Sequence, residues 1–321
     1  MKLKDVFKKI FSIDDYSDER YMLTILGIKL RLQKNEFKKL RKQNPFYYYK
    51  KNNIDITTIP PAEGQIREVQ LANLALLREM DYVCKENGLK YWIDAGTLIG
   101  ALRHKGFIPW DDDIDTAMMR EDYDKIIEAF DKSSRNPDIY ADYFRDELSQ
   151  GQYFIKVQHR KCPHVFVDIF PFDVYGPSMS VKEQLQRTKK VKNIIKYIKH
   201  STNNLTTNEE LKAKIDTLMS EKVLVNQIPE DIETSDLIWG INFHHRWNNW
   251  FTNYNVIFPL RTIMFEGYEF SCMNNPDVFL TRVYGNYMAY PKKITLGHNA
   301  YKKFSEEDKV ILKELIDSLN K

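Results

Sequence analysis

Residues 91–123 read YWIDAGTLIGALRHKGFIPWDDDIDTAMMREDY and decide which fold the rest of the chain has to complete. An apolar strand pattern ends at Asp94, and a Gly96-Thr97 turn leads into a short helix predicted from Leu98 to Arg103. A second strand is predicted from Ile114 to Met118. Carboxylates, a tight turn and basic side chains thus fall within one strand–helix–strand unit, which is the composition of a metal-assisted phosphate site.

Four aspartates occupy five positions at the start of the second strand, namely Asp111, Asp112, Asp113 and Asp115. Because side chains alternate along a strand, Asp113 and Asp115 are expected on one side, with Asp111 beside them by spacing. These three carboxylates could share Mg²⁺ or Mn²⁺, hard cations that prefer oxygen ligands. Asp112 is expected to face solvent. The alternative for the cluster is an acidic cap on a helix predicted from Glu121 to Lys132.

Two further features complete the predicted site. Gly96 and Thr97 follow a strand and open a helix, where free backbone N–H groups can bind phosphate, although an ordinary turn is the simpler interpretation. Asp168 is a lone charge between apolar residues in a later strand pattern, and a buried carboxylate needs a partner. It could be a metal ligand or a base that takes a proton from an attacking hydroxyl, and the structural alternative is a buried salt bridge.

Basic and aromatic side chains near these motifs are the candidates for substrate contacts. Arginine can bind two phosphate oxygens at once, and tryptophan or tyrosine can stack on cytosine or face a quaternary ammonium. For each aromatic side chain, packing in the core is the competing interpretation. The candidates are Arg103, His104, Lys105, Trp110, Lys156, Tyr284, Tyr290 and His298, with Trp92 and Arg160 as further ones.

Composition narrows the function class only slightly. The 321 residues carry a net charge of +3, too small an excess to indicate nucleic-acid binding. Cys84, Cys162 and Cys272 are far apart and form neither a zinc pair nor a disulfide framework, which favours a reducing compartment. No apolar run is long enough for a transmembrane helix and no signal-peptide pattern is present, so we expect a cytoplasmic protein.

An N-terminal appendage is predicted for residues 1–60, ending at Pro60-Pro61. Residues 1–13 place apolar side chains on one helical face among lysines, which suits an anionic membrane surface or packing on the protein's own domain. Residues 21–32 predict a hairpin around Gly27. If the basic segment 1–50 meets headgroups, the protein would be peripheral on the inner face of the plasma membrane.

The remaining residues, 61–321, are expected to form one catalytic domain. An amphipathic helix is predicted over residues 63–88, with Asn73 interrupting its apolar stripe. Residues 180–252 are polar and basic, with stretches such as RTKKVK from Arg187, and predict a helical lobe on the acceptor side of the site.

Three blocks of the sequence resemble the LicD family of phosphotransferases. They are YWIDAGTLIGALRHKGFIPWDDDIDTAMMREDY, the VDIFPFD segment from Val167, and the YGNYM segment from Tyr284 with Pro291 and His298. The first block is also similar to the fukutin-related proteins. Asn286 stands where many family members have aspartate, which weakens any direct catalytic role for that position. The resemblance covers roughly residues 65–300 and implies an α+β fold, a nucleotidyltransferase-like mixed sheet flanked by helices.

The resemblance implies a reaction as well as a fold. A family member transfers a phospho-alcohol, most often phosphocholine, from a CDP-alcohol to a hydroxyl of a cell-surface glycan or glycolipid and releases CMP. Carried over to this sequence, the metal positions are Asp111, Asp113, Asp115 and Asp168. Transfer of glycerol phosphate, ribitol phosphate or phosphoethanolamine stays open. So do a true nucleotidyltransferase that moves NMP and a catalytically dead glycan-binding protein. No nucleic-acid partner is expected.

Overall fold

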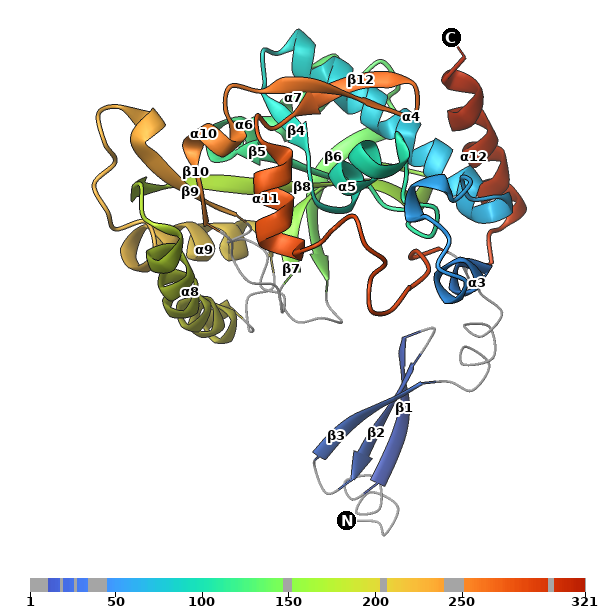
Figure 1. Ribbon diagram of the computed structural model, residues 1–321, viewed down its shortest axis with the longest axis horizontal. Coiled ribbons are helices and arrows are strands. Elements are labelled where there is room, and N and C mark those ends of the chain that lie inside the picture. Colours follow the sequence, from blue (N-terminus) through green and yellow to red (C-terminus); the bar gives the residue numbers. More distant parts are fainter. Residues whose placement is uncertain are drawn as a thin grey trace. The chain divides into compact units, whose positions relative to one another are not determined.

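The structure is a computed structural model, and it divides into two compact units, residues 1–55 and 56–321 (Figure 1). The residues that it describes are 11–17, 20–25, 28–33, 45–146, 152–202, 207–239, 251–299 and 303–320.

The described residues of the first unit form a three-stranded antiparallel sheet and the helix α3. Strand β2 pairs with β3 in the antiparallel arrangement expected of the predicted hairpin, and β1 pairs with the other edge of β2. The predicted turn at Gly27 lies outside the described residues. The helix predicted for residues 1–13 lies outside the described residues up to position 10, and its last residues belong to β1. The elements are β1 (Phe11–Ser17), β2 (Arg20–Ile25), β3 (Ile28–Gln33) and α3 (Pro45–Lys51).

A seven-stranded mixed sheet forms the centre of the second unit and confirms the predicted α+β fold with a mixed sheet flanked by helices. Its main path runs β10-β9-β8-β5-β4, and the β6–β7 hairpin joins the sheet through β8. Among the described pairs, β5 and β8 are parallel and the others are antiparallel. The strands are β4 (Tyr91–Ile93), β5 (Asp115–Met119), β6 (Ile139–Asp146), β7 (Gln152–His159), β8 (Cys162–Pro177), β9 (Ser235–Trp239) and β10 (Phe251–Asn253).

Helices and a separate hairpin cover this sheet, and the longest helix, α4, packs beside the C-terminal α12 (Figure 1). The helical elements are η1 (Ile56–Thr58), α4 (Gly64–Glu86), α5 (Ala95–His104), α6 (Arg120–Tyr123), α7 (Ile126–Ser133), α8 (Val181–Thr202), α9 (Asn208–Lys222), η2 (Ile232–Thr234), α10 (Tyr254–Ile257), α11 (Pro276–Tyr284) and α12 (Glu306–Ser318). The hairpin consists of β11 (Arg261–Phe265) and β12 (Tyr268–Cys272).

Helix α4 matches the predicted helix and explains the interruption in its apolar stripe. Val69, Leu76 and Met80 are completely buried, as amphipathic spacing requires. Asn73 is also completely buried, and its side-chain amide makes two hydrogen bonds to residues outside α4. Its Nδ2 donates to the carbonyl oxygen of Asp112 at 2.6 Å, and its Oδ1 accepts from the backbone N–H of Phe166 at 2.7 Å. The Asn73 side chain therefore connects β8 to the loop before β5 that carries Asp111, Asp112 and Asp113, here called the acidic loop.

Parts of the predicted secondary structure were wrong. Among the described residues of 180–252, α8, α9 and the short η2 are helical, whereas β9 and β10 extend the central sheet. The core sequence of β9, SDLIW, is buried throughout, and so short an apolar run does not distinguish a strand from a buried helix. The helix predicted from Glu121 to Lys132 is divided into α6 and α7.

The described residues bear on the predictions about the cysteines and about membrane-spanning helices. Cys84, Cys162 and Cys272 are all buried and free of disulfide bonds. Within the described ranges, no helix combines the length and the apolar character needed to cross a bilayer.

We predict that Asn73→Leu lowers the free energy of unfolding by about 2–4 kcal/mol, because it leaves a buried carbonyl and a buried N–H without partners. Chemical denaturation would measure the loss. Asn193→Leu on the exposed side of α8 is the matched control and should change stability by less than about 0.5 kcal/mol. Equal effects of the two substitutions would contradict a structural role for the Asn73 amide.

Candidate active site

The parallel register of β5 and β8 brings two predicted carboxylates together. Asp115, the first residue of β5, is the direct partner of Asp168 on β8. The Asp168 N–H donates to the carbonyl oxygen of Ile114 at 2.8 Å, and the Thr116 hydroxyl donates to the carbonyl oxygen of Asp168 at 2.9 Å. Both backbones are therefore fixed where the two carboxylates leave the sheet.

Asp111 and Asp113 lie in the loop before β5, so strand alternation does not place them as the sequence pattern suggested. They still lie near Asp115: a Cβ atom at Gly96 would be 3.0 Å from Asp111 Oδ2 and 3.7 Å from Asp115 Oδ2, and the charge of Asp113 acts on both Asp111 and Asp115. Burial and then the charge of Asp113 raise the pKa of Asp111 well above its usual range. The same two causes, followed by the charges of Asp168 and Asp94, raise the pKa of Asp115. The cluster therefore holds more negative charge than it accommodates easily.

Asp112 does not face solvent, and this prediction was wrong. Its exposure is 1%, and its carboxylate accepts hydrogen bonds from the backbone N–H groups of His298 at 2.6 Å and Asn299 at 2.8 Å. Gly297 packs so closely on this carboxylate that a Cβ atom there would collide with it. Asp112 thus fixes the C-terminal segment against the acidic loop, which explains why it points away from the other three aspartates.

The Gly96-Thr97 pair supports the acidic residues directly. Helix α5 begins earlier than predicted, at Ala95, so both residues lie in its first turn. The N–H of Gly96 donates to Asp115 Oδ2 at 3.3 Å, and the Thr97 hydroxyl accepts from the N–H of Asp115 at 2.8 Å. A Cβ atom at Gly96 would lie 3.0 Å from Asp111 Oδ2, so only glycine leaves room for that carboxylate.

Asp94, the N-cap of α5, is buried beneath the cluster with an exposure of 1%. Its carboxylate accepts a hydrogen bond from the N–H of Ala95 at 2.8 Å. Burial raises the pKa of Asp94 from 3.8 to about 7, although the contacts with Ala95 and Trp239 lower it. An ionised Asp94 therefore costs folding free energy.

Lys156 forms a buried ion pair with Asp168, at 2.7 Å between Nζ and Oδ1. The side chains are 8% and 11% exposed. The Lys156 ammonium also lies 3.4 Å from the ring centre of Phe166, 4.7 Å from that of Phe144 and 5.2 Å from that of Phe154. Asp168 thus has the salt-bridge partner that the sequence left as an alternative. Burial raises the pKa of Asp168, and Lys156 opposes that shift.

Arg103, Trp110 and Tyr290 form one wall near the acidic loop. The Trp110 and Tyr290 rings stack with centres 6.3 Å apart, and the Arg103 guanidinium lies 5.8 Å from the Trp110 ring centre. Arg103 also donates to the carbonyl oxygen of Tyr287 at 2.6 Å and to His104 at 2.9 Å. Burial lowers the pKa of Arg103 to about 10, and burial followed by the Arg103 charge lowers the pKa of His104 to about 4. His104 is therefore neutral near pH 7.

Other candidates differ in how close they come to the carboxylates. His298 Nδ1 lies 3.5 Å from Asp113 Oδ2, and hydrogen bonding to Asp112 followed by the charge of Asp113 raises the pKa of His298. Burial, followed by the charges of Asp115, Asp94, Asp111 and Asp113, raises the pKa of the Tyr284 hydroxyl, which places it near the cluster. Lys105 is exposed and ends α5 in a left-handed conformation.

Trp92 and Arg160 do not join the site. Trp92 is completely buried and packs edge-on against Phe172 and Phe258. Arg160 lies over the Tyr140 ring at 4.5 Å and donates to the carbonyl oxygen of Pro137. Trp92 therefore belongs to the core, as the competing interpretation held.

Buried polar residues that the sequence analysis did not assign to the site hold the acidic loop from behind. Gln70 donates to the carbonyl oxygen of Asp111 at 2.7 Å and binds Arg67, which makes a two-bond ion pair with Glu266 on the β11–β12 hairpin. Glu266 also accepts from the N–H of Phe107 at 3.0 Å. Only polar residues inside the apolar stripe of α4 could have signalled this support.

The donor atoms suit a hard divalent cation, because Asp111, Asp113, Asp115 and Asp168 offer carboxylate oxygens. The charge balance suits one too. Asp94 lies below these four carboxylates, and the nearby cationic or ionisable groups are Arg103, Lys156 and His298. In the described part of the chain, however, no three acidic, histidine or cysteine side chains converge as in a preassembled metal centre.

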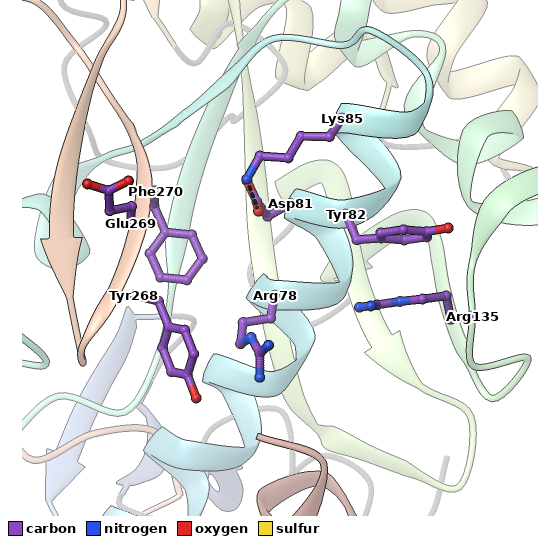
Figure 2. A pocket seen from close by; sticks show the side chains of 8 residues that line it. All are labelled: Arg78, Asp81, Tyr82, Lys85, Arg135, Tyr268, Glu269 and Phe270. Carbon is purple, nitrogen blue, oxygen red and sulfur yellow. Dashed lines mark hydrogen bonds and ion pairs between the residues drawn. The ribbon is translucent and has the colours of Figure 1, made fainter. Parts of the chain in front are cut away.

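A surface pocket of about 330 Å³ between α4 and β12 is lined by none of these residues (Figure 2). Arg135 lies 4.0 Å from the Tyr82 ring centre and is bound to Glu79, while Arg78 lies 4.4 Å from the Tyr268 ring centre. Arg78 also donates to the carbonyl oxygen of Leu319. Because both guanidinium groups already have partners, we assign no ligand to this pocket.

The family model described as LicD/FKTN/FKRP, nucleotidyltransferase domain, matches residues 88–209. Lipopolysaccharide cholinephosphotransferase LicD of Haemophilus influenzae is 29% identical over 252 residues, which cover 70% of this chain and 92% of that protein. Ribitol 5-phosphate transferase FKRP of Homo sapiens, like that of Mus musculus, is 30% identical over 90 residues, which are 28% of this chain and 18% of each transferase. The matched domain contains Asp111, Asp113, Asp115 and Asp168.

We predict that Lys156→Met lowers the free energy of unfolding by about 3–5 kcal/mol, because it leaves the Asp168 carboxylate buried without its cation. Adding Asp168→Leu should recover at least about 2 kcal/mol, since the double variant buries no charge there. Denaturant titrations would compare them with Lys161→Met, which removes an exposed ion pair to Asp138 and should cost less than about 1 kcal/mol. A double variant no more stable than Lys156→Met would contradict the ion-pair account.

We predict a pH-dependent gain in stability for Asp94→Asn. The folded-state pKa is raised to about 7, so the native protein holds a proton that the unfolded chain releases near pH 3.8. Stability is lost as pH rises between these values, and the uncharged asparagine avoids that loss. In EDTA, the variant should exceed the parent by on the order of 3–4 kcal/mol above pH 8 and by little near pH 4. A difference independent of pH, or the same profile for exposed Asp131→Asn, would refute the assignment.

Proposed function

The chain belongs to the LicD family of phosphotransferases, and on that premise we propose that it transfers a phospho-alcohol from a CDP-alcohol to a hydroxyl of a cell-surface glycan. The resemblance predicted from three sequence blocks is thereby confirmed at the level of the family, and the relatives named in the comparison support a transferase. The CDP donor, the metal and the alcohol are the parts that we propose.

The acidic cluster is the observation that carries the proposal. Asp115 and Asp168 are neighbours in the sheet, and Asp111 and Asp113 are held beside them by a loop with its own buried supports. Burial, followed by the charges of neighbouring aspartates, raises the pKa values of Asp111 and Asp115. A divalent cation together with a diphosphate substrate would supply a balanced set of charges.

We propose that Asp111, Asp113, Asp115 and, with them, Asp168 hold Mg²⁺ or Mn²⁺. A bound divalent cation neutralises diphosphate oxygens and the charge that develops on a leaving phosphate. Asn73 and Gln70 hold the loop that carries two of these carboxylates, so their hydrogen bonds would keep the donor oxygens in place before substrate arrives.

Transfer itself requires one bond to form and one to break. The acceptor oxygen would bond to the phosphorus of the phospho-alcohol, the bond from that phosphorus to the CMP oxygen would break, and the acceptor hydroxyl would lose its proton. Asp168 is the proposed proton acceptor, since burial raises its pKa while Lys156 limits the shift. Arg103, on the Trp110–Tyr290 wall, is a proposed phosphate contact.

Phosphocholine is the group that we favour for transfer, because a relative that aligns with 70% of this chain is named a lipopolysaccharide cholinephosphotransferase. The stacked Trp110 and Tyr290 rings offer aromatic surface of the kind that attracts a quaternary ammonium. Ribitol phosphate is the second candidate, because the two mammalian relatives are named ribitol 5-phosphate transferases. Glycerol phosphate and phosphoethanolamine would use the same phosphate chemistry.

Two other functions remain to be separated from this one. A true nucleotidyltransferase would use the same carboxylates but release pyrophosphate from CTP. A catalytically dead glycan-binding protein would not need the crowded carboxylates, which cost folding free energy when no cation is bound.

We predict CMP release with a CDP-alcohol and none with CTP. The purified protein would be incubated with a glycan acceptor, Mg²⁺ and, separately, CDP-choline, CDP-ethanolamine, CDP-glycerol, CDP-ribitol or CTP, and CMP and pyrophosphate would be measured. CDP-choline should give the fastest release. Asp113→Asn should reduce the rate by about 100-fold or more, because it removes a charge at the site of transfer.

Asp131→Asn is the matched control, since Asp131 is an exposed residue of α7 and makes the same chemical change outside the site. Pyrophosphate from CTP would replace the proposal by nucleotidyl transfer. Full activity of Asp113→Asn would sink the assignment of the acidic cluster.

A further inference from the structure

Helix α8 carries a basic surface that the proposed reaction does not use. Its sequence is VKEQLQRTKKVKNIIKYIKHST, and Figure 1 shows it at the periphery of the second unit. Side chains are described for its first 14 residues, 181–194, which include five basic residues and one acidic residue, Glu183. Glu183 accepts hydrogen bonds from Ser180 at the start of the helix, so its charge is engaged there.

Five exposed residues of α8 fall on one stripe, and Glu183, Gln186, Lys190 and Asn193 are exposed beside it. At about 100° per residue, Val181, Lys182, Leu185, Lys189 and Lys192 lie within an arc of about 100°. All five are exposed, and the two apolar side chains among them are 58% and 56% exposed. Glu183 lies outside the arc, so this stripe combines lysines and aliphatic side chains without an acidic residue.

The opposite face of α8 fixes this orientation. Gln184 is completely buried and donates to Asp236 at 2.8 Å, and Val191 is 1% exposed within a cluster that includes Leu211 and Ile215 of α9. Turning the stripe inward would break a buried hydrogen bond and expose part of that cluster. The stripe therefore belongs to the outer surface of the folded unit.

We propose that the α8 stripe docks on an anionic phospholipid bilayer. The lysines complement negatively charged headgroups, and Val181 and Leu185 are placed to enter the boundary between headgroups and acyl chains. A soluble polyanion would use the lysines alone and would leave the two exposed aliphatic side chains without a function. The helix lies on the surface in this arrangement and does not cross the bilayer.

This surface is independent of the transferase chemistry, so docking can be tested without a donor or an acceptor. Such docking would bring the site to glycolipid acceptors. It also differs from the membrane contact predicted for the basic segment 1–50, because each surface can be altered separately.

The test is co-sedimentation of the full chain with vesicles of phosphatidylglycerol and phosphatidylcholine, or of phosphatidylcholine alone, in low salt. We expect binding only to the anionic vesicles and weaker binding as salt is added. Lys182→Gln with Lys189→Gln should weaken binding by about 25-fold, at about fivefold for each lysine near the surface. Leu185→Ser should weaken it by about three- to tenfold, because less apolar surface enters the bilayer.

Helix α12 supplies matched controls. Lys309→Gln with Lys313→Gln removes two exposed lysines and changes the net charge equally, and Val310→Ser truncates an aliphatic side chain that is 54% exposed. Neither should change vesicle binding by more than about twofold. Circular dichroism and CMP release would confirm that the α8 variants are folded and active.

Three results would overturn the proposal. The first is that the parent protein does not bind anionic vesicles. The second is that the α8 variants bind like the parent protein, which would locate any contact elsewhere, for example in residues 1–50. The third is that Leu185→Ser has no effect while soluble heparin binds as tightly as the vesicles, which would identify α8 as a site for soluble polyanions.

Discussion

Parallel pairing between β5 and β8 sets Asp115 beside Asp168, and the other parts of the site are arranged around these two residues. The pairing is unusual within this sheet, whose other described neighbours are antiparallel. It requires the chain to leave β5, build α6, α7 and the β6–β7 hairpin, and return in the same direction along β8. A carboxylate 53 positions away in sequence thereby becomes a direct neighbour.

Buried polar residues hold in place the loop that carries Asp111, Asp112 and Asp113. Asn73 and Gln70 bind backbone oxygens of the acidic loop from α4, and Asp112 binds two backbone N–H groups of the C-terminal segment. Each of these groups is desolvated and would cost free energy without its partner. The loop is therefore fixed by directed hydrogen bonds, since apolar packing alone would not determine where its carboxylates point.

Local patterns in the sequence predicted more of this arrangement than its long-range contacts. The two predicted strands and the helical spacing over residues 63–88 agree with β4, β5 and α4, and the three-block resemblance implied the mixed sheet and the family whose model matches residues 88–209. The orientation of Asp112 was wrong, because period-2 alternation was applied to residues that precede β5. Its partners lie 186 and 187 positions away, beyond any local pattern. The buried run of β9 was likewise ambiguous without its neighbour β8.

Charge pairing divides the buried acids into two groups. Asp173 is paired with Arg120, Glu79 with Arg135 and Asp168 with Lys156, so these carboxylates contribute to the fold with their charge largely balanced. Asp111 and Asp115 are different, because neighbouring carboxylates account for most of the charge around them. Folding would favour replacing such residues by neutral ones, since each repels the others in a desolvated loop. Their grouping is therefore better explained by the divalent cation and diphosphate that we propose to bind there than by the stability of the protein itself.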